Sequence, residues 1–523
     1  MMRDIGPVFP TREAFQELAK ADHKIIPVTT TLLPDGLTPV GIYRRLANDA
    51  PGTFLLESAG QDGKWSRYSF IGAGSAATLT EHDGQAVWQG RVPAGVPSTG
   101  KPLEVLEESL EFLATDARAD ISDALPHLVS GFVGFLGWDT VRAWVELGEG
   151  PEDDLNLPSM AMNLVTDLAI HDSWDGTVTL VANAINFDGE STGVDGAYDR
   201  AVERLESMVQ RLAEPVADPV SFAPAGWLDQ DFSSQIDHSW HEKDFLNAVR
   251  KTQQSIREGE VSQLVISRRF TTPTTATAFD TYRVLRAINP SPYMFLYTFE
   301  YPDREGTYHL VGASPETLVS VKDKRVLTHP IGGSKPKDPS RTIRSIGDEL
   351  LADPKERDEH IQLVDLAKTE LSAVCAPGTV EVSDFMVVQQ FSHILHLVST
   401  VEGDIGANTT ALDVLRANFP AGTLSGSPKH RALELLDEWE PHARGPFGGT
   451  VGYFDLAGNM DMAITIRTAV LKDQVAYLQA GAGIVAESVP ATEAHETLTK
   501  ATAAIRAVLA AQQLQDIKAG KQN

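Results

Sequence analysis

The sequence predicts an α+β fold built of large antiparallel sheets flanked by helices. Segments with strand character and segments with helix character follow one another in runs of unequal length, whereas a parallel α/β sheet needs regular alternation. Residues 455–459, Asp-Leu-Ala-Gly-Asn, join two apolar strands at the spacing of a hairpin, and a hairpin pairs its strands antiparallel. The first half of the chain contains many short apolar runs separated by turn residues, which indicates a strand-rich portion.

The first 213 residues form this strand-rich portion. Its apolar runs predict strands at 53–57, 68–72 and 130–135. The helical period of residues 197–212 predicts a helix at the end of the portion.

Residues 214–240 have the composition of a linker, since prolines recur every few residues, and the predicted domain boundary lies there. Residues 241–515 form the second portion and residues 516–523 a short tail. Helices of the second portion are predicted at 241–258, 354–373, 411–417, 428–439 and 492–513. Its strands are predicted at 261–270, 293–299, 310–312, 449–455, 460–471 and 474–480.

The composition limits the kinds of partner. At 523 residues with 42% hydrophobic content, the chain can bury large cores. Its 72 acidic and 44 basic residues give a formal charge of -28, which argues against nucleic acid or an anionic membrane as a partner. An anionic substrate would therefore need positive charge close to its binding site.

Two further observations favour a cytoplasmic location. The single cysteine, Cys375, excludes an internal disulfide and fits a reducing compartment. The first residues lack the apolar run of a secretion signal, and no stretch is apolar enough to span a bilayer. We therefore expect a cytoplasmic protein without a membrane partner.

Two pairs of glutamates are the strongest chemical signal. Glu493 and Glu496 precede Lys500 on one face of a predicted helix, and Glu356 and Glu359 repeat the same spacing at the start of another. One carboxylate from each helix can bind a single hard cation while the other holds water in the outer shell. Magnesium prefers oxygen ligands and keeps several waters, so the two pairs predict a Mg2+ site.

The alternative is ordinary helix chemistry. An isolated Glu-x-x-Glu is usually a solvated helix end, here with an intrahelical pair between Glu496 and Lys500. In the other helix, Asp353 is the predicted N-cap, and Glu356 can close a capping box with it. We accept the cap at Asp353, and we favour the metal because the glutamate pair occurs twice.

Positive and neutral groups for an anion lie nearby in the sequence. The small residues of Ala480-Gly-Ala-Gly-Ile-Val485 allow backbone N–H groups to approach a negative ligand closely. Alternation along the predicted strand 460–471 puts Arg467 on the face of small and polar residues, where it can bind a carboxylate. The alternative for an arginine on a strand is a solvated surface charge.

Two loops complete the pattern. The glycine-containing segment 419–429 runs into a helix, with Ser427 as the predicted N-cap and Pro428 as the first helical residue. Such a helix start can hold an anion, although capping explains it about as well. Residues 329–337, with two lysines, are predicted to form a turn.

Together these segments resemble the chorismate-utilising enzymes, and most closely the large subunits of anthranilate synthases. The resemblance spans nearly the whole chain. It rests on six ordered motifs, at 330–334, 358–366, 419–429, 448–455, 464–468 and 480–484. It implies the chorismate-utilising-enzyme fold with an N-terminal regulatory portion, and a Mg2+-dependent lyase.

The resemblance also implies a set of binding residues. The metal ligands would be Glu359 and Glu496, with Glu356 and Glu493 acting largely through water. The cation binds the ring carboxylate of chorismate. The other residues implied to bind the substrate are Gly333, Ser334, Phe447, Arg467, Gly481, Ala482, Gly483 and Lys500.

Four residues match catalytic positions of the family. Glu316 matches the general acid that protonates the departing ring hydroxyl, and burial beside an anionic substrate raises a carboxyl pKa as this role requires. Thr423 and His396 match positions near the reacting ring, with His396 linked to pyruvate elimination; without the resemblance, His396 would be read as a packed core residue. Gln263 stands where water-adding members carry a lysine base, so a nitrogen nucleophile is favoured.

Two short segments resemble the feedback site for L-tryptophan. Its implied residues are Leu56, Glu57, Ser58, Pro292, Tyr293, Met294, Phe295 and Ala463. Read only as structure, the segments would be a strand end and a proline-rich turn. The chain departs from the family at three of its implied site residues: Phe447 replaces a usual tyrosine, Ser334 a threonine, and Ala463 a frequent cysteine.

The resemblance implies a two-step reaction in which ammonia replaces the hydroxyl of chorismate and pyruvate is then lost to give anthranilate. The chain has no Gly-x-Cys-x-Gly nucleophile elbow, so ammonia from glutamine must come from a separate amidotransferase subunit in a hetero-oligomer. Two alternatives remain. An aminodeoxychorismate synthase component I is disfavoured by the tryptophan-like segments and by Gly332, where many such enzymes carry a lysine nucleophile. A catalytically silent tryptophan-binding regulator is disfavoured because the catalytic residues are present.

Overall fold

The computed structural model describes residues 6–21, 23–59, 67–117, 125–189, 193–214, 220–222, 226, 231–390 and 394–516. The predicted tail, apart from its first residue, and residues 215–219, 223–225 and 227–230 of the predicted linker lie outside this set. 

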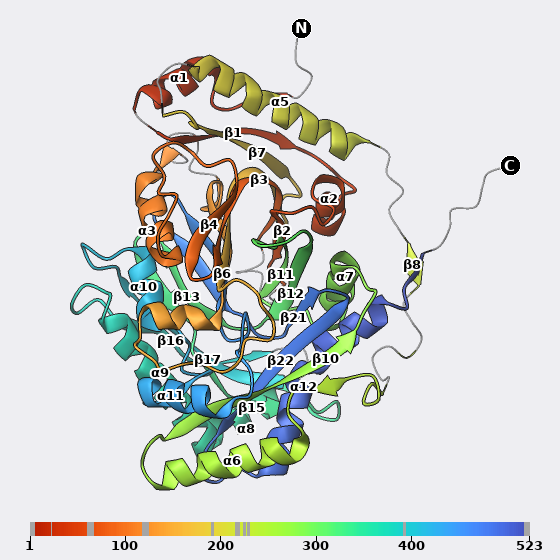
Figure 1. Cartoon of the computed structure of the whole chain (residues 1–523), viewed down its shortest axis with the longest axis vertical. Helices are drawn as coiled ribbons and strands as arrows, with labels where there is room; N and C mark the ends of the chain where they lie inside the picture. The colour runs from red at the N-terminus through yellow and green to blue at the C-terminus, as the bar shows by residue number, and fades with distance from the viewer. Residues whose placement is uncertain are drawn as a thin grey trace, which may run out of the picture.

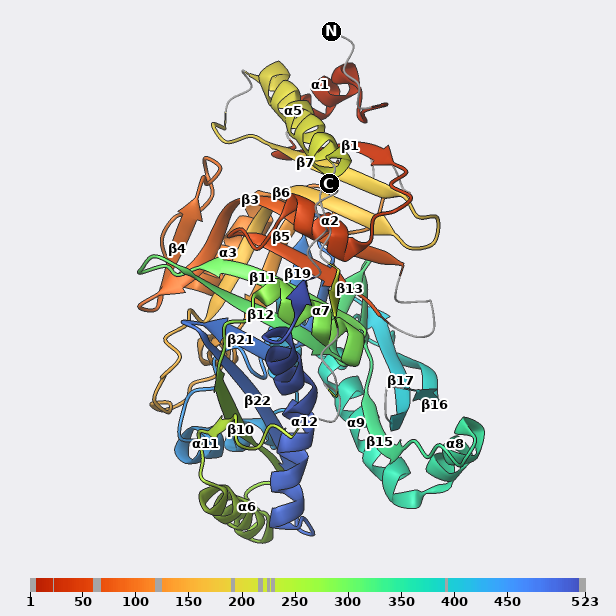
Figure 2. The same cartoon turned by 90° about the vertical axis from the view of Figure 1, so that its right-hand side faces the viewer.

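The N-terminal portion is rich in strands, as predicted. Its strands are β1 (Ile25–Leu32), β2 (Thr53–Glu57), β3 (Tyr68–His82), β4 (Gln85–Gly90), β5 (Gly131–Leu136), β6 (Met160–Asp172) and β7 (Val178–Ile185). Its helices are α1 (Arg12–Lys20), α2 (Pro39–Leu46), α3 (Pro102–Phe112), α5 (Val194–Ala213) and the short 3-10 helix Trp138–Ala143. Helices α1 and α5 lie over β1 and β7 at one end of the molecule (Figures 1 and 2).

The remaining chain mixes strands and helices. Its helices are α6 (Glu242–Arg257), α7 (Ala278–Ile288), α8 (Ile343–Ala352), α9 (Pro354–Ser372), α10 (Ala411–Asn418), α11 (Lys429–Trp439) and α12 (Pro490–Ala511). Its first strands are β8 (Ser221–Phe222), β9 (Asp237–His238), β10 (Gln263–Pro273), β11 (Tyr293–Glu300), β12 (Thr307–Ser314), β13 (Thr317–Lys322), β14 (Arg325–Thr328) and β15 (Ile331–Pro336). They are followed by β16 (Glu381–Gln390), β17 (Ile394–Asp404), β18 (Gly426–Ser427), β19 (Thr450–Asp455), β20 (Met460–Ile464), β21 (Thr468–Lys472), β22 (Val475–Ile484) and β23 (Gln515–Asp516).

One hydrogen-bonded network connects both portions. Of the strands in the described residues, 21 belong to this network, and its long strands pair antiparallel, which confirms the predicted α+β fold. Strand β2 pairs with β11, and β5 pairs with β19, so N-terminal strands complete sheets of the C-terminal portion. The boundary at 214–240 stays a prediction.

Helix α12 carries one of the glutamate pairs and is anchored by its other residues. Ala501, Ala504, Ile505 and Val508 are buried, and the helix packs against α7, α6 and β22. Small alanine side chains let these elements approach closely, so the start of the helix is held beside the end of β22 (Figure 2).

The second glutamate pair lies on α9. The predicted cap is confirmed: the Asp353 carboxylate accepts a hydrogen bond from the Lys355 N–H at 3.1 Å, and Pro354 is the first helical residue. Helices α8 and α9 pack against β15 and β17 to one side of the molecule (Figure 2).

The predicted strand 460–471 is wrong in its middle. Strand β20 ends at Ile464 and β21 begins at Thr468, while Arg467 between them has a left-handed φ of 54°. A residue with that backbone conformation interrupts a strand, so alternation does not decide where Arg467 points.

Two loop predictions are also corrected. Ser427 is not the cap of α11: it pairs with Gln263 in an extended conformation, and the helix begins at Lys429 after Pro428. The predicted turn at 329–337 contains β15, which pairs with β17. Gly333 has φ +71° and lies where the register shifts, so the glycine that suggested a turn forms a bulge inside a strand.

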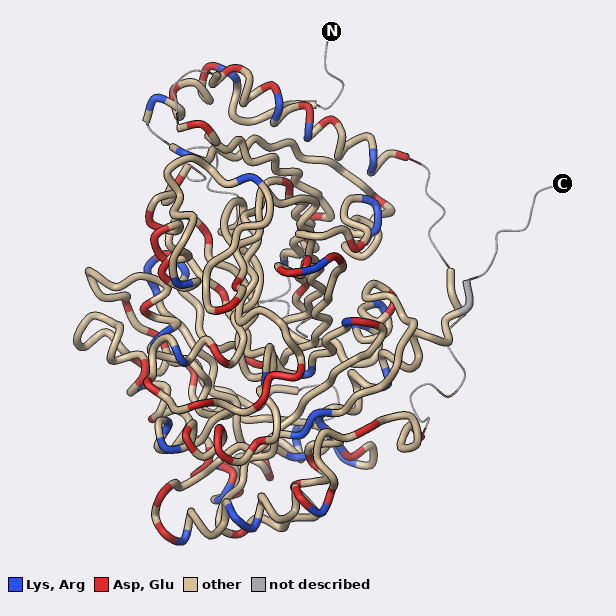
Figure 3. Tube along the Cα trace, in the orientation of Figure 1, with Lys and Arg blue, Asp and Glu red and all other residues tan. Residues whose placement is uncertain are grey.

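Charges are distributed over the whole chain. Acidic residues occur from α5 at one end to α6 at the other, with lysines and arginines interspersed (Figure 3). Of the helices in the described ranges, none combines the length and apolar character required to cross a membrane.

Candidate active site

Glu316 lies in the connection between β12 and β13. Its Oε1 accepts a hydrogen bond from Thr423 Oγ1 at 3.1 Å. Burial raises the pKa of Glu316 to about 7, although the bond from Thr423 and the charges of Lys500 and Arg467 oppose this shift. The carboxyl group is thus poised to hold and release a proton near neutral pH.

Arg467 and Lys500 bring positive charge to the same place. Burial lowers the pKa of Arg467 to about 10, and the charges of Glu496 and Glu316 oppose this shift, so the guanidinium stays protonated at neutral pH. Its Nη1 donates to the backbone oxygen of Lys500. The Lys500 ammonium donates to the Gly481 carbonyl at 3.1 Å and pairs with Glu496 Oε1 at 2.6 Å. The side chain of Arg467 therefore joins the connection between β20 and β21 to α12.

The glutamates of α9 and α12 influence one another. Burial raises the pKa of Glu359, and the negative charges of Glu356 and Glu496 raise it further. Burial also raises the pKa of Glu493, to which the charge of Glu496 contributes. Two helices thus bring like charges together, an arrangement that a cation between them would stabilise.

The donor set can be compared with the needs of a metal ion. Within the described part of the chain, no group of three or more His, Cys, Asp or Glu side chains forms a ready metal site. Magnesium typically uses one or two protein carboxylates and completes its shell with waters and substrate oxygens. The pair Glu359 and Glu496 fits such an ion.

Strand β15 holds Glu356. The Ser334 N–H donates to Glu356 Oε2 at 2.6 Å, so this carboxylate is bound to β15. The Asp353 N–H instead donates to the Leu350 carbonyl, so it is not bonded by Glu356 as a capping box requires. Ser334 also lies opposite His396 on β17, which brings both predicted residues beside the glutamates.

His396 is neutral at physiological pH. Burial lowers its pKa to about 4, and the charges of Arg467 and Lys500 lower it further, against a hydrogen bond with the backbone of Gly333. The imidazole therefore belongs to the same cluster of charges as Glu316 and serves as a neutral group there.

The glycines of β22 are required by close contacts. A Cβ at Gly481 would lie 2.9 Å from Val265 Cγ1 and 3.8 Å from the Phe447 ring, and a Cβ at Gly483 would lie 2.9 Å from Gln263 Nε2. Phe447 and Gln263 thus flank the same stretch of β22. Ala482 is fully buried in the apolar core, so its side chain is directed away from them.

Gly333 provides a test of this local geometry. In G333A, an L-residue would occupy φ +71°, and its Cβ would lie 2.9 Å from the Glu356 carbonyl oxygen. We expect a lower thermal unfolding midpoint, with a loss of about 1–3 kcal/mol. The control is G378A, because Gly378 has φ +82° but open space around its Cβ position. Equal effects of the two substitutions would contradict a role for the contact with Glu356.

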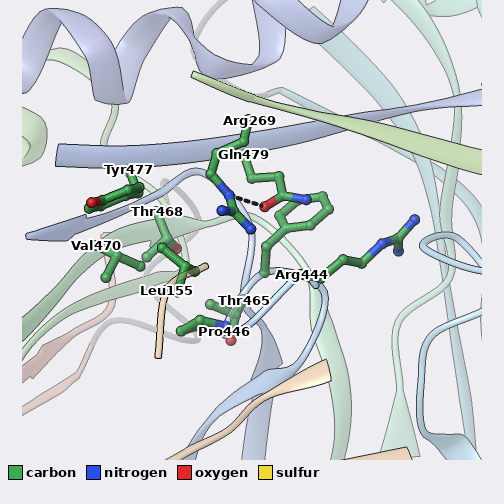
Figure 4. A pocket seen from close by; sticks show the side chains of 10 residues that line it. Leu155, Arg269, Arg444, Pro446, Thr465, Thr468, Val470, Tyr477 and Gln479 are labelled. Carbon is green, nitrogen blue, oxygen red and sulfur yellow. Dashed lines mark hydrogen bonds between the residues drawn. The ribbon is translucent and has the colours of Figure 1, made fainter. Parts of the chain in front are cut away.

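Two cavities adjoin these residues. One, of about 20 Å³, lies beside Phe447 and is shown in Figure 4. It is about large enough for a single water. Two of the side chains that line it are bonded to each other, since Arg269 Nε donates to Gln479 Oε1 at 3.2 Å. The other, of about 60 Å³, adjoins Glu316 between α9 and residues 421–423. The second cavity thus lies directly against the buried carboxyl group of Glu316.

The residues predicted for the inhibitor come together in a second place. Leu56 on β2 lies opposite Phe295 on β11, and Glu57 lies opposite Met294. Ser58 follows β2, and its Oγ is enclosed with no hydrogen-bond partner within the described ranges. Most buried polar groups of folded proteins have a hydrogen-bond partner, so this hydroxyl is consistent with a ligand at this position.

The sequence reasoning missed the side chains that hold Glu57. Tyr282 donates its hydroxyl to Glu57 Oε2 at 2.6 Å, and Arg286 binds both carboxylate oxygens at 2.9 and 3.1 Å. The two lie one turn apart on α7, which a helical pattern shows, but their partner is more than two hundred residues earlier in the chain. No local signal could have identified it.

Comparison with known proteins agrees with the geometry. The sequence profile of the family described as chorismate binding enzyme matches residues 52–506. Anthranilate synthase component 1 of Arthrobacter globiformis is 52% identical over 99% of this chain and 96% of its own length. The protein of the same name from Mycobacterium tuberculosis H37Rv is 46% identical, with 96% of each chain covered.

Solved structures give the same result for the fold. Anthranilate synthase component I from Streptococcus pneumoniae TIGR4 superimposes with a TM-score of 0.70 at 31% identity, over 90% of this chain and 98% of that one. The menaquinone-specific isochorismate synthase of Escherichia coli has a TM-score of 0.68 at 17% identity, over 95% and 99% of the two chains, and supports the fold alone.

Proposed function

The chain belongs to the chorismate binding enzyme family, and we propose on this basis that it is the large subunit of an anthranilate synthase. It converts chorismate and ammonia to anthranilate, pyruvate and water, which commits chorismate to tryptophan biosynthesis. The observation that carries the mechanism is the largely buried Glu316, with a pKa of about 7, in one cluster with Arg467 and Lys500.

Binding of the substrate uses the positive groups of this acidic protein. Glu359 and Glu496, with Glu356 and Glu493 acting through water, would hold a Mg2+ ion, and this ion would supply positive charge for the ring carboxylate. Lys500 and the backbone of 481–483 contact the same carboxylate, since the Lys500 ammonium already lies 3.1 Å from the Gly481 carbonyl. Arg467 binds the enolpyruvyl carboxylate, and Gly333, Ser334 and Phe447 line the pocket.

The first step replaces a hydroxyl by an amine. Ammonia attacks ring carbon 2, the two conjugated double bonds of the ring shift, and the bond from carbon 4 to its hydroxyl breaks. Glu316 transfers its proton to the departing hydroxyl, which leaves as water, while Thr423 orients the carboxyl group through its 3.1 Å hydrogen bond. Gln263 has no basic nitrogen to activate water, so water does not compete with ammonia as the nucleophile.

The second step aromatises the ring. The amino intermediate loses the proton at ring carbon 2, which bears the amino group, and the ether bond at the neighbouring carbon 3 breaks to release pyruvate. The neutral imidazole of His396 lies near the ring as a group that can assist this elimination.

A separate amidotransferase subunit supplies ammonia from glutamine. This chain contributes no nucleophile for that reaction, since its one cysteine, Cys375, is buried and burial raises the pKa of its thiol to about 11. The two subunits thus form a hetero-oligomer.

L-Tryptophan inhibits the enzyme from the second set of residues. The support for this site is the pairing of β2 with β11 and the enclosed Ser58 hydroxyl beside it. The inhibitor acts by favouring a less active arrangement of the same chain.

One assay tests the proposed reaction against its two alternatives. The pure chain is incubated with chorismate, Mg2+ and an ammonium salt at alkaline pH, and anthranilate fluorescence is recorded with and without tryptophan. We expect fluorescence that depends on Mg2+ and is suppressed by tryptophan. An amino product without fluorescence would indicate an aminodeoxychorismate synthase component, and tryptophan binding without turnover would indicate a silent regulator.

A further inference from the structure

The backbone around Glu316 is bonded to the strands that carry the proposed inhibitor residues. The Glu316 carbonyl accepts a hydrogen bond from the Ile464 N–H at 3.1 Å, and Ile464 directly follows Ala463 on β20. Thr317, the residue after Glu316, lies opposite Ala463 in the pairing of β13 with β20. The general acid and one residue of the inhibitor set are therefore neighbours across a single strand pair.

A side-chain bond makes a second connection. The Thr317 hydroxyl lies 2.9 Å from the Tyr293 hydroxyl, which also lies 3.0 Å from Asp461 Oδ1. A phenol has one proton, and an ionised carboxylate can only accept, so Tyr293 donates to Asp461 and Thr317 donates to Tyr293. The Lys322 ammonium pairs with the other oxygen of Asp461, Oδ2, at 2.9 Å, so the carboxylate is held from two sides.

The bond joins two groups with little freedom to move separately. Thr317 is 9% exposed and is itself paired with Ala463, and the register of β13 and β20 shifts only after it. Tyr293 is the first residue of β11, the strand that carries Met294 and Phe295. A shift of Tyr293 on binding of a ligand would thus be transmitted through one hydroxyl to the residue next to Glu316.

From these contacts we infer that Thr317 is a positioning residue that couples the tryptophan site to the general acid Glu316. This inference rests on the proposed function, because it requires both the catalytic role of Glu316 and binding of tryptophan at β2 and β11. Occupation of the inhibitor site changes the Tyr293–Thr317 bond, which displaces the Glu316 carboxyl group from Thr423 and from the leaving hydroxyl. The coupling acts over neighbouring residues and needs no long pathway.

The test variant is T317V, which replaces the hydroxyl by a methyl group of nearly the same size. Activity is measured with ammonia as the nitrogen donor, with and without saturating tryptophan. The inhibition ratio is the activity without tryptophan divided by the activity with it, and it is taken within each variant so that changes in basal activity cancel. We expect the ratio to fall by about 2–10-fold relative to the unmodified chain, the range of one hydrogen bond. Calorimetry should show that tryptophan still binds.

The control is T328V. Thr328 is also buried, and its hydroxyl donates to the Leu318 carbonyl at 3.0 Å, outside the link to Tyr293. T328V should keep the inhibition ratio of the unmodified chain. If T317V keeps it too, while tryptophan still inhibits the unmodified chain, the inference is overturned. If tryptophan neither binds nor inhibits the unmodified chain, the proposed regulation itself fails.

Discussion

Replacing Glu496 by glutamine is expected to abolish Mg2+-dependent turnover while tryptophan still binds. The variant keeps the size of the side chain but removes the charge that we propose binds the cation, and it also breaks the 2.6 Å pair with Lys500. Loss of an outer-shell partner costs about 10–100-fold in metal affinity or activity, so loss of a direct ligand should cost more than about 100-fold. The measurement is the initial rate of anthranilate formation from ammonia across a Mg2+ titration.

Two comparisons make this result specific. E359Q should have the same effect from the other helix, and the double variant should add little, because both carboxylates serve one ion. E487Q is the control, since Glu487 is an exposed acidic residue just before α12 and should leave the rate unchanged. Near-normal Mg2+-dependent turnover by E496Q would refute the metal assignment.

Replacing Glu316 by glutamine is expected to lower kcat by about 10²–10⁴-fold with little change in the KM for chorismate. The amide cannot give a proton to the leaving hydroxyl, and this contribution is made only as the bond breaks. A large rise in KM with kcat intact would instead assign Glu316 to substrate binding.

The pH dependence follows from the same residue. A general acid must be protonated to act, and the pKa of about 7 means that the protonated fraction of Glu316, the proposed acid, falls about tenfold for each pH unit above that value. The rate of the unmodified chain, divided by the concentration of free ammonia, should therefore decline above pH 7, whereas E316Q should lack this decline. In T423V, which loses the bond that lowers the pKa, the decline should move to higher pH.

Thermal unfolding serves as the control for E316Q. Burial raises the folded-state pKa of Glu316 above its unfolded value of about 4.5, so ionisation destabilises the folded chain as pH rises from about 5 to 8. Glutamine cannot ionise. E316Q should therefore lose less stability than the unmodified chain over this range. If E316Q is unfolded at pH 8, the kinetic comparison is made with Glu316→Asp, in which the decline of the rate with pH should persist.

Much of the site could be predicted because its signals are local. The repeated Glu-x-x-Glu spacing placed Glu356 with Glu359 and Glu493 with Glu496 at helix starts, and both helices are present. The small residues at 480–484 predicted the close approach of a negative ligand, which stays a prediction; in the folded chain, Gly481 and Gly483 adjoin Val265 and Gln263. Side-chain period and residue size act within a few residues, so such features can be read without the fold.

Errors occurred where distant strands decide the local backbone. Alternation predicted one strand through Arg467, but pairing of β20 with β13 and of β21 with β12 splits it and leaves Arg467 in a left-handed conformation. Ser427 has the residue type of a cap, yet pairing with Gln263 holds it extended. In both cases a sheet partner far away in the chain outweighed the local preference.

The amino acids alone therefore decided which chemistry is available: four carboxylates in two helical pairs, a glycine-rich strand, an arginine and a lysine in an acidic chain. Only the folded chain decided how these groups act. It buried Glu316 and moved its pKa to about 7, set Glu359 within reach of the charge of Glu496, and bonded Tyr293 to Thr317. Desolvation and charge–charge energies depend on distances between segments that are remote in sequence, and those distances exist only after the sheets have paired.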